Sequence, residues 1–150
     1  MLFRSKPRGI TIADDYAHHP AELEATLTAA KEMNFNHVWA VFQPFTYSRT
    51  AMLLNDFARV LALADRVVMT EIMGSREINT YNIYTKDLAD KIPGSVWFNT
   101  FEEVADYVVA RAEPCLLYTS SFSMSRNSSL QIESSLASVY REAAQAISRE

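Results

Sequence analysis

Residues 37–50, HVWAVFQPFTYSRT, join a nearly continuous apolar run to a short segment rich in hydroxyl groups. The apolar part, residues 37–42, has the length and composition of a strand that is buried on both faces. Strands of this kind occur mainly in parallel sheets that helices cover on both sides. This stretch therefore predicts an α/β fold, and the same alternation continues on either side of it.

Other short apolar runs predict further strands. Three lie at residues 9–13, 65–70 and 95–98, and residues 115–119 are a candidate for a fifth strand. Each is too short for an ordinary helix, and most are rich in the β-branched and aromatic residues that strands favour. The sheet is therefore expected to contain about five to six strands.

Helical patterns fill the intervals between these runs. A first helix is predicted over residues 20–34, a second is expected to be capped by Ser48, and a short one is expected near residues 86–92. Another follows Thr100, which forms a capping-box pattern with Glu103. The alternation predicts an α/β fold, a Rossmann-like three-layer sandwich with a mainly parallel sheet and helices on both faces.

Composition and charge exclude several functional classes. The 150 residues are 49% hydrophobic and 21% charged, as expected for one soluble globular domain. The formal net charge of −4 argues against a nucleic-acid partner, and no apolar stretch approaches the roughly 18–20 residues of a membrane span. A single cysteine, Cys115, cannot form an internal disulfide. We therefore expect a cytoplasmic protein that binds neither nucleic acid nor membrane.

Two polar loops carry most of the side chains with chemical potential. Residues 13–20, ADDYAHHP, follow the first predicted strand, and residues 43–50, QPFTYSRT, follow the second. Ligands of parallel sheets bind beyond the carboxyl ends of the strands, where these loops lie. A carboxylate there can accept the hydroxyls of a ribose, a ring can stack on a base, and Arg49 can bind a carboxylate or phosphate. The loops together predict a site for an anionic nucleotide and an acid.

Structural explanations compete with these assignments. An aspartate before a helix is often a cap, so Asp14 and Asp15 each have a structural explanation, and His37 is expected to be structural. A metal site built from the two aspartates with His18 and His19 is not expected, because neighbours at a helix start point in different directions. We therefore predict no metal ligand in this chain.

The scarcity of glycine limits what the chain can bind by itself. It contains only three glycines and has neither a P-loop nor a dinucleotide fingerprint. The chain alone is therefore not expected to hold a triphosphate.

Three segments resemble the C-terminal domain of the Mur ligase family, in particular its branch that joins L-alanine to UDP-N-acetylmuramate. They are residues 14–20, DDYAHHP, residues 41–50, VFQPFTYSRT, and residues 70–77, TEIMGSRE. The similarity extends from about residue 9 to residue 114. It implies an ATP- and Mg²⁺-dependent ligase in which the amine of L-alanine attacks an acyl phosphate. It also implies partners absent from this chain: an N-terminal domain for the UDP-sugar and a central domain with the P-loop and most of the Mg²⁺ site.

The resemblance also assigns roles to individual residues. It implies that Asp15 binds the ribose and that Tyr16 and His18 line the nucleotide or substrate pocket. His19 and Gln43 are then expected at the substrate, together with Arg49. Arg49 would in addition be catalytic, because a fixed cation stabilises developing negative charge. Phe45 and Thr46 depart from the family pattern, in which many relatives carry a histidine and a basic residue at these positions.

The end of the chain departs from the family pattern more strongly. We therefore divide the sequence into a Mur ligase C-terminal domain, residues 1–114, and an atypical tail, residues 115–150. The tail contains a candidate strand and a helical pattern from Leu130, and it is either a genuine replacement or the product of a broken reading frame.

Two other functions compete with a ligase domain. One is a stand-alone, non-catalytic module that binds a nucleotide or an acidic metabolite. The other is a metal-dependent hydrolase that uses the aspartate and histidine cluster, which would require tight zinc or manganese binding.

Overall fold

A computed structural model describes residues 2–5 and 9–120 of the chain. They form a six-stranded sheet in the order β1-β2-β6-β3-β4-β5. The pairings β2–β6, β6–β3, β3–β4 and β4–β5 are parallel, and only β1 is antiparallel to its neighbour. The strands are β1 (Leu2–Ser5), β2 (Thr11–Asp15), β3 (Val38–Phe42), β4 (Arg66–Thr70), β5 (Val96–Phe98) and β6 (Leu116–Ser120). The predicted, mainly parallel sheet is confirmed.

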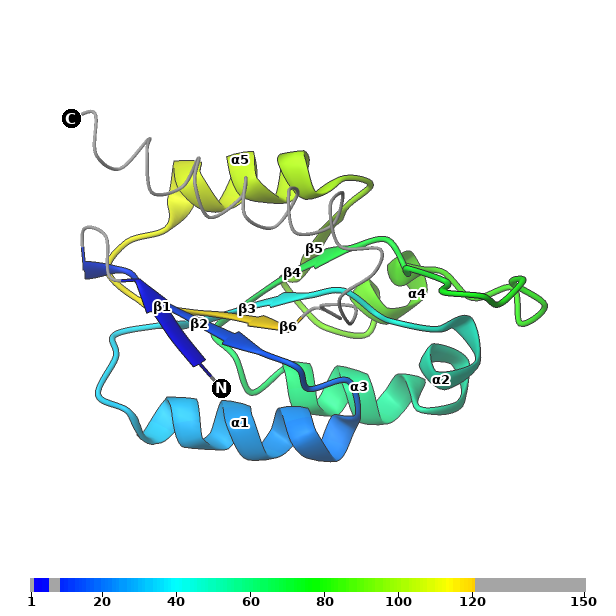
Figure 1. Ribbon diagram of the computed structural model, residues 1–150, viewed down its shortest axis with the longest axis horizontal. Coiled ribbons are helices and arrows are strands. Elements are labelled where there is room, and N and C mark those ends of the chain that lie inside the picture. Colours follow the sequence, from blue (N-terminus) through cyan, green and yellow to red (C-terminus); the bar gives the residue numbers. More distant parts are fainter. Residues whose placement is uncertain (1, 6–8, 121–150) are drawn as a thin grey trace.

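Helices cover both faces of this sheet (Figure 1). One face carries α1 and α3, and the other carries α5. The helices are α1 (Pro20–Glu32), α2 (Tyr47–Met52), α3 (Leu54–Leu61), α4 (Thr85–Ala89) and α5 (Phe101–Arg111). The presence of helices on both faces confirms the predicted three-layer sandwich. Among the described residues, no helix has the length and apolar character needed to cross a membrane.

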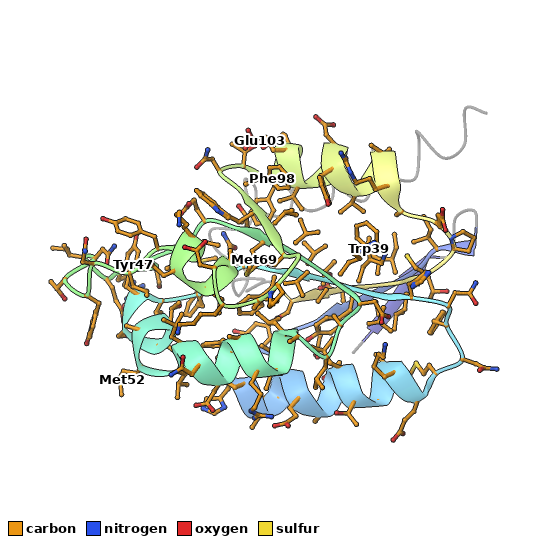
Figure 2. All side chains as sticks on the ribbon, turned by 180° about the vertical axis from the view of Figure 1, so that it is seen from behind. Trp39, Tyr47, Met52, Met69, Phe98 and Glu103 are labelled. Atoms are coloured by element: carbon orange, nitrogen blue, oxygen red, sulfur yellow. The ribbon has the colours of Figure 1, made fainter. Side chains whose placement is uncertain are left out.

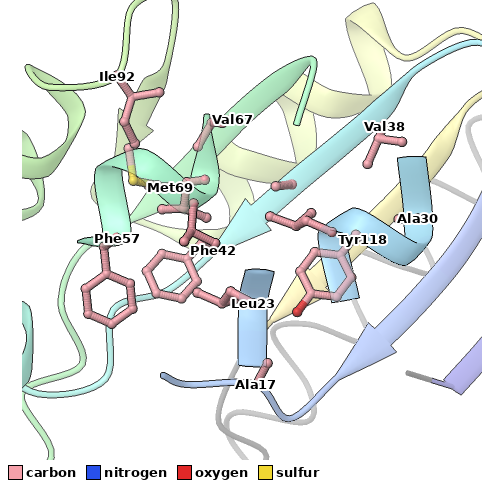
Figure 3. Close-up of a cluster of buried hydrophobic side chains, with 14 of the residues drawn as sticks. Ala17, Leu23, Ala30, Val38, Phe42, Phe57, Val67, Met69, Ile92 and Tyr118 are labelled. Carbon is pink, nitrogen blue, oxygen red and sulfur yellow. The ribbon is translucent and has the colours of Figure 1, made fainter. Parts of the chain in front are cut away.

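The central strand β3 is buried along its whole length, and its side chains divide between two cores. Ala40 and Phe42 face the core beneath α1 and α3, where Phe42 packs against Phe57 with ring centroids 5.5 Å apart. Figure 3 shows this cluster, including Leu23 of α1. The intervening Trp39 and Val41 belong to the opposite core beneath α5. Successive strand residues point to opposite faces, so one apolar run supplies both cores.

The helix starts confirm one cap prediction and correct another. Thr100 and Glu103 form the predicted capping box at the start of α5. Ser48, however, is not a helix cap. Thr46 is the N-cap of α2, because its extended backbone lets its side chain accept a hydrogen bond from the N–H of Arg49. Ser48 lies inside the first turn of α2 and donates to Glu77 instead.

The predicted second helix is interrupted. Leu53, with φ −113° and ψ 22°, leaves the helical region and separates α2 from α3. The short helix expected near residues 86–92 is also shorter than predicted, since α4 ends at Ala89 with Asp90 as its C-cap. These differences arise because the apolar spacing of a helix continues through a break in its backbone.

The candidate strand at residues 115–119 is confirmed, one residue later, as β6. It lies between β2 and β3, pairing Leu117 with both Ile12 and Trp39. The helical pattern from Leu130 lies outside the described residues. The domain boundary after residue 114 stays a prediction.

Replacing Leu27 with alanine tests the core beneath α1. Leu27 is fully buried, so Leu27→Ala should lower the free energy of unfolding by about 2–5 kcal/mol. The measurement is urea denaturation of the whole chain. Thr28→Ala, on the exposed side of the same helix, is the control and should change it by less than about 0.5 kcal/mol. Equal effects of the two substitutions would contradict the assigned face of α1.

Candidate functional site

The two polar loops meet at one edge of the sheet. Parallel pairing sets Asp15 at the end of β2 and Phe42 at the end of β3 opposite the same residue of β6, Ser120. The chain leaving β3 stays at this edge, where the N–H of Gln43 donates to the Ser120 carbonyl at 3.2 Å. The two loops predicted from the sequence to bind ligands therefore begin at the same edge of the sheet, on either side of β6.

Asp15 is a half-buried carboxylate held by several hydrogen bonds. Its Oδ2 accepts from the Thr26 hydroxyl at 2.8 Å and from the Tyr118 hydroxyl at 3.1 Å, and its Oδ1 accepts from the Tyr16 N–H at 2.9 Å. Burial acts to raise the pKa of this carboxyl, but hydrogen bonds, including those from Thr26 and the Tyr16 N–H, outweigh it and leave the pKa below 3.8. Asp15 is thus an oriented, ionised acceptor. It does not cap α1, because His19 holds that position.

The two adjacent histidines have different surroundings. His19 is the N-cap of α1, and its Nδ1 accepts from the Ala21 N–H at 3.2 Å. His18 lies 3.1 Å, through Nδ1, from the carbonyl oxygen of Tyr16, and its ring meets the half-exposed Tyr16 ring edge-on at 5.6 Å. His18 therefore associates with Tyr16, whereas His19 lines a groove beside α2.

Glu22 fixes the backbone of both histidines. Its Oε2 accepts from the His18 N–H at 2.9 Å and from the His19 N–H at 3.1 Å. The hydrogen bond from the His18 N–H contributes most to lowering the pKa of Glu22 below 4.5. The predicted ligand residues are therefore part of the helix start itself, so their backbone geometry depends on this capping box.

A groove of about 480 Å³ opens beside the start of α2. It brings His19 together with Arg49, two of the predicted substrate residues. Figure 2 labels Tyr47 and Met52 of α2 at the end of the molecule away from Trp39. The lining residues are His19, Thr46, Ser48, Arg49, Met52, Leu53 and Glu77.

The side chain of Arg49 has an unmet hydrogen-bonding requirement. Its Nη1 is buried and has no hydrogen-bond partner, and the same is true of Oε1 of Gln43. A buried polar atom without a partner costs about 1–3 kcal/mol, and more when the group is charged. An anion bound at Nη1 would remove this cost. The predicted third member of the group, Gln43, is turned partly away, since its Nε2 donates to the Glu71 carbonyl at 3.3 Å.

The segment after β4 forms the scaffold of this loop. The Met73 N–H donates to the Pro44 carbonyl at 2.9 Å, and Glu77 accepts from the Ser48 N–H at 2.8 Å. Gly74 has φ +74°, and a Cβ placed there would lie 2.7 Å from Cε2 of Tyr47. No local pattern in the sequence indicated a role for Gly74 or Glu77, although Gly74 is one of only three glycines in the chain.

The described residues contain no group of three or more histidine, cysteine or acidic side chains arranged to hold a metal ion. Asp14, Asp15, His18 and His19 are consecutive or nearly so, yet their side chains separate. Asp14 accepts from the Thr119 hydroxyl, Asp15 turns toward Thr26, and His19 caps α1.

Comparison with known proteins places this chain in one family. Residues 1–122 match the family model of the Mur ligase, glutamate ligase domain. Among curated relatives, the UDP-N-acetylmuramate--L-alanine ligase of Agathobacter rectalis is 47% identical over 110 residues, which is 71% of this chain and 24% of that protein. The same ligase of Lachnospira eligens is 46% identical over 105 residues, or 67% of this chain and 23% of that protein. The chain thus spans about a quarter of the length of these relatives.

Solved structures show the same fold. A murein peptide ligase from Psychrobacter arcticus matches with a TM-score of 0.67 at 16% identity, covering 99% of this chain and 29% of that one. UDP-N-acetylmuramate-alanine ligase from Thermotoga maritima matches with a TM-score of 0.63 at 24% identity, covering 94% and 27%. At these identities the likeness concerns the fold.

The contact between Gly74 and Tyr47 can be tested against a second glycine. Gly74→Ala combines a left-handed backbone with a close contact, whereas Gly94, with φ +78°, has nothing within 4 Å of the position that a Cβ would take. Gly94→Ala should cost only the backbone strain, about 1–2 kcal/mol, and Gly74→Ala should cost more. Thermal unfolding of both variants provides the measurement, and equal losses would contradict the close packing of Tyr47 on Gly74.

The capping box at Glu22 predicts a dependence of stability on pH. Because the pKa of Glu22 is lower in the folded chain than its usual 4.5, its contribution is complete above about pH 4.5 and disappears as pH falls through the folded-state pKa. Glu22→Gln should therefore be less stable than the native chain near neutral pH and converge with it in acid. Urea midpoints across this range test the expectation, with the exposed Glu113→Gln as control. A constant offset at every pH would contradict it.

Proposed function

Because this chain belongs to the Mur ligase family through its glutamate ligase domain, we propose that it serves as the C-terminal domain of an ATP-dependent ligase. The reaction proposed is the addition of L-alanine to UDP-N-acetylmuramate, a step in the synthesis of peptidoglycan precursors. The curated relatives with 46–47% identity carry this ligase name. The chain spans about a quarter of their length, so the activity, the substrates and the partner domains are part of the proposal.

The unpartnered Nη1 of Arg49 is the observation that carries this proposal. Arg49 lines a groove and has one buried guanidinium nitrogen without a hydrogen-bond partner, which favours an anionic ligand. The reaction offers such anions in sequence: the carboxylate of UDP-N-acetylmuramate, the transferred phosphate, and the oxyanion formed when the amine attacks. Arg49 would stabilise the charge as it develops, which acts on turnover more than on folding.

The other predicted residues fit the nucleotide and the substrate. Asp15 is ionised and oriented at the strand end, where its carboxylate can accept the hydroxyls of a ribose. Tyr16 presents a half-exposed ring with His18 against its edge, and a base could stack on it. His19 lines the groove together with Arg49, so we assign it to the substrate. We assign Gln43 there too, since its free Oε1 can accept an N–H from a bound amine.

The proposed chemistry needs parts that this chain does not supply. ATP transfers its γ-phosphoryl group to the carboxylate, and ADP leaves. The amine of L-alanine then attacks the acyl phosphate, phosphate departs with the C–O bonding electrons, and the amine loses a proton. We place the P-loop and most of the Mg²⁺ ligands on the preceding domains, because the chain has no P-loop sequence and its described residues offer no fitting set of ligands. Closure of this domain over ATP would exclude water from the acyl phosphate. We propose a cytoplasmic location for this ligase.

A chimera tests the proposal. This chain replaces the matching C-terminal segment of the Agathobacter rectalis ligase, and phosphate release is measured with ATP, UDP-N-acetylmuramate and L-alanine. We expect release that depends on L-alanine, and a fall in kcat of about 10²-fold or more for Arg49→Ala, because a fixed cation is lost from the transition state.

Arg59→Ala is the matched control for this experiment. Arg59 forms an exposed ion pair with Glu24 on α1, and its loss should leave kcat nearly unchanged. If Arg49→Ala and Arg59→Ala retain equal turnover, the role proposed for Arg49 is wrong.

A further inference from the structure

The first turn of α2 depends on a side chain from another part of the fold. With six residues, α2 is too short to be stable in isolation. The N–H groups of its first turn need acceptors outside the helix. Thr46 accepts from Arg49, and Glu77 accepts from the Ser48 N–H at 2.8 Å and from the Ser48 hydroxyl. The capping of α2 is thus shared between a local residue and a distant carboxylate.

Glu77 is itself held in place by a tight turn. Its N–H donates to the Gly74 carbonyl at 2.9 Å, and Gly74 adopts a left-handed conformation against the Tyr47 ring. The Met73 N–H joins the same segment to Pro44. The carboxylate of Glu77 therefore reaches α2 from a segment that is tied at several points to the loop after β3.

The hydrogen bonds of Glu77 go to Ser48 and leave Nη1 of Arg49 unpartnered. Both side chains line the groove, and the positive charge of Arg49 contributes to the lowered pKa of Glu77, after the larger effect of the hydrogen bonds from Ser48. Yet the two carboxylate oxygens point to Ser48, and Nη1 of Arg49 has no hydrogen-bond partner. Glu77 thus holds the residue next to Arg49 and leaves Nη1 of Arg49 without a hydrogen bond.

The geometry points to Glu77 as a positioning residue for Arg49. By anchoring Ser48, its carboxylate fixes the first turn of α2 and with it the direction in which the guanidinium enters the groove. The inference rests on the proposed function, in which Arg49 binds the acid or the phosphate.

Electrostatics alone predicts the opposite effect, which makes the inference testable. Glu77→Ala removes a negative charge beside the groove. If Glu77 acted only through its charge, an anion would bind more tightly to this variant. If Glu77 positions Arg49, the anion should bind more weakly although the site has become more positive.

The first experiment measures binding of inorganic phosphate to the whole chain. The Arg49 Nε–H signal in ¹⁵N–¹H spectra follows the titration. We expect Glu77→Ala to raise the Kd at least fivefold, and Glu77→Asp to recover part of the loss. Glu102→Gln, which removes an exposed carboxylate from the first turn of α5, is the matched control and should leave the Kd unchanged. An unchanged or lower Kd in Glu77→Ala would overturn the inference.

A second measurement needs no ligand and decides the matter if phosphate binds too weakly. The heteronuclear NOE of the Arg49 Nε–H should fall in Glu77→Ala, because the side chain loses its fixed base, and should stay at the native value in Glu102→Gln. An unchanged NOE would overturn the inference even if Glu77→Ala lowered the thermal stability of the chain.

Arg49→Ala separates the inference from the function on which it rests. Its phosphate binding is followed at the Ser48 amide. If it binds phosphate as the native chain does, the anion-binding role proposed for Arg49 fails. If it loses binding whereas Glu77→Ala does not, only the positioning role of Glu77 fails.

Discussion

The burial of β3 on both faces is the constraint on which the rest of the structure depends. A strand with helices on either side has no solvent-facing side chains, and every residue of Val38–Phe42 is accordingly apolar and buried. Polar chemistry can then appear only where the strand ends. Because the neighbouring strands run parallel to β3, their carboxyl ends lie at the same edge, and the loops that follow them converge there.

Within these loops, the residues that hold the fold and the residues available to a ligand are closely interleaved. His19 lines the groove and also caps α1, and Glu22 fixes the backbone of the histidine pair. At α2, Thr46 and Glu77 satisfy the first turn while Arg49, in the same turn, keeps one nitrogen unpartnered. A helix start offers N–H groups that need acceptors, so side chains that meet this need also set the direction of their neighbours.

The comparison with relatives gives this arrangement a context. The fold is shared with solved Mur ligases at 16–24% identity, whereas the segments aligned with the curated relatives at 46–47% identity make up only about a quarter of the length of those relatives. Under the proposed function, Arg49 in the groove and Asp15 at the end of β2 would form one half of an active site. In the proposed enzyme the other half, with the phosphates of ATP, would come from the preceding domains.

The sequence by itself determined the α/β class, the positions of five strands within a residue or two, and the two loops that carry the site. Hydrophobic periodicity and strand length report burial locally, and the motifs at residues 14–20, 41–50 and 70–77 identified the family. The sequence pattern placed the cap of α2 at Ser48 instead of Thr46. It also did not show the break at Leu53, because apolar spacing continues across the break. The tertiary structure alone decided that His19 and not His18 lines the groove, and that Glu77 reaches Ser48 from 29 residues away. Such contacts follow from the order of strands in the sheet and the paths of the loops between them, and no local pattern in the sequence carries that information.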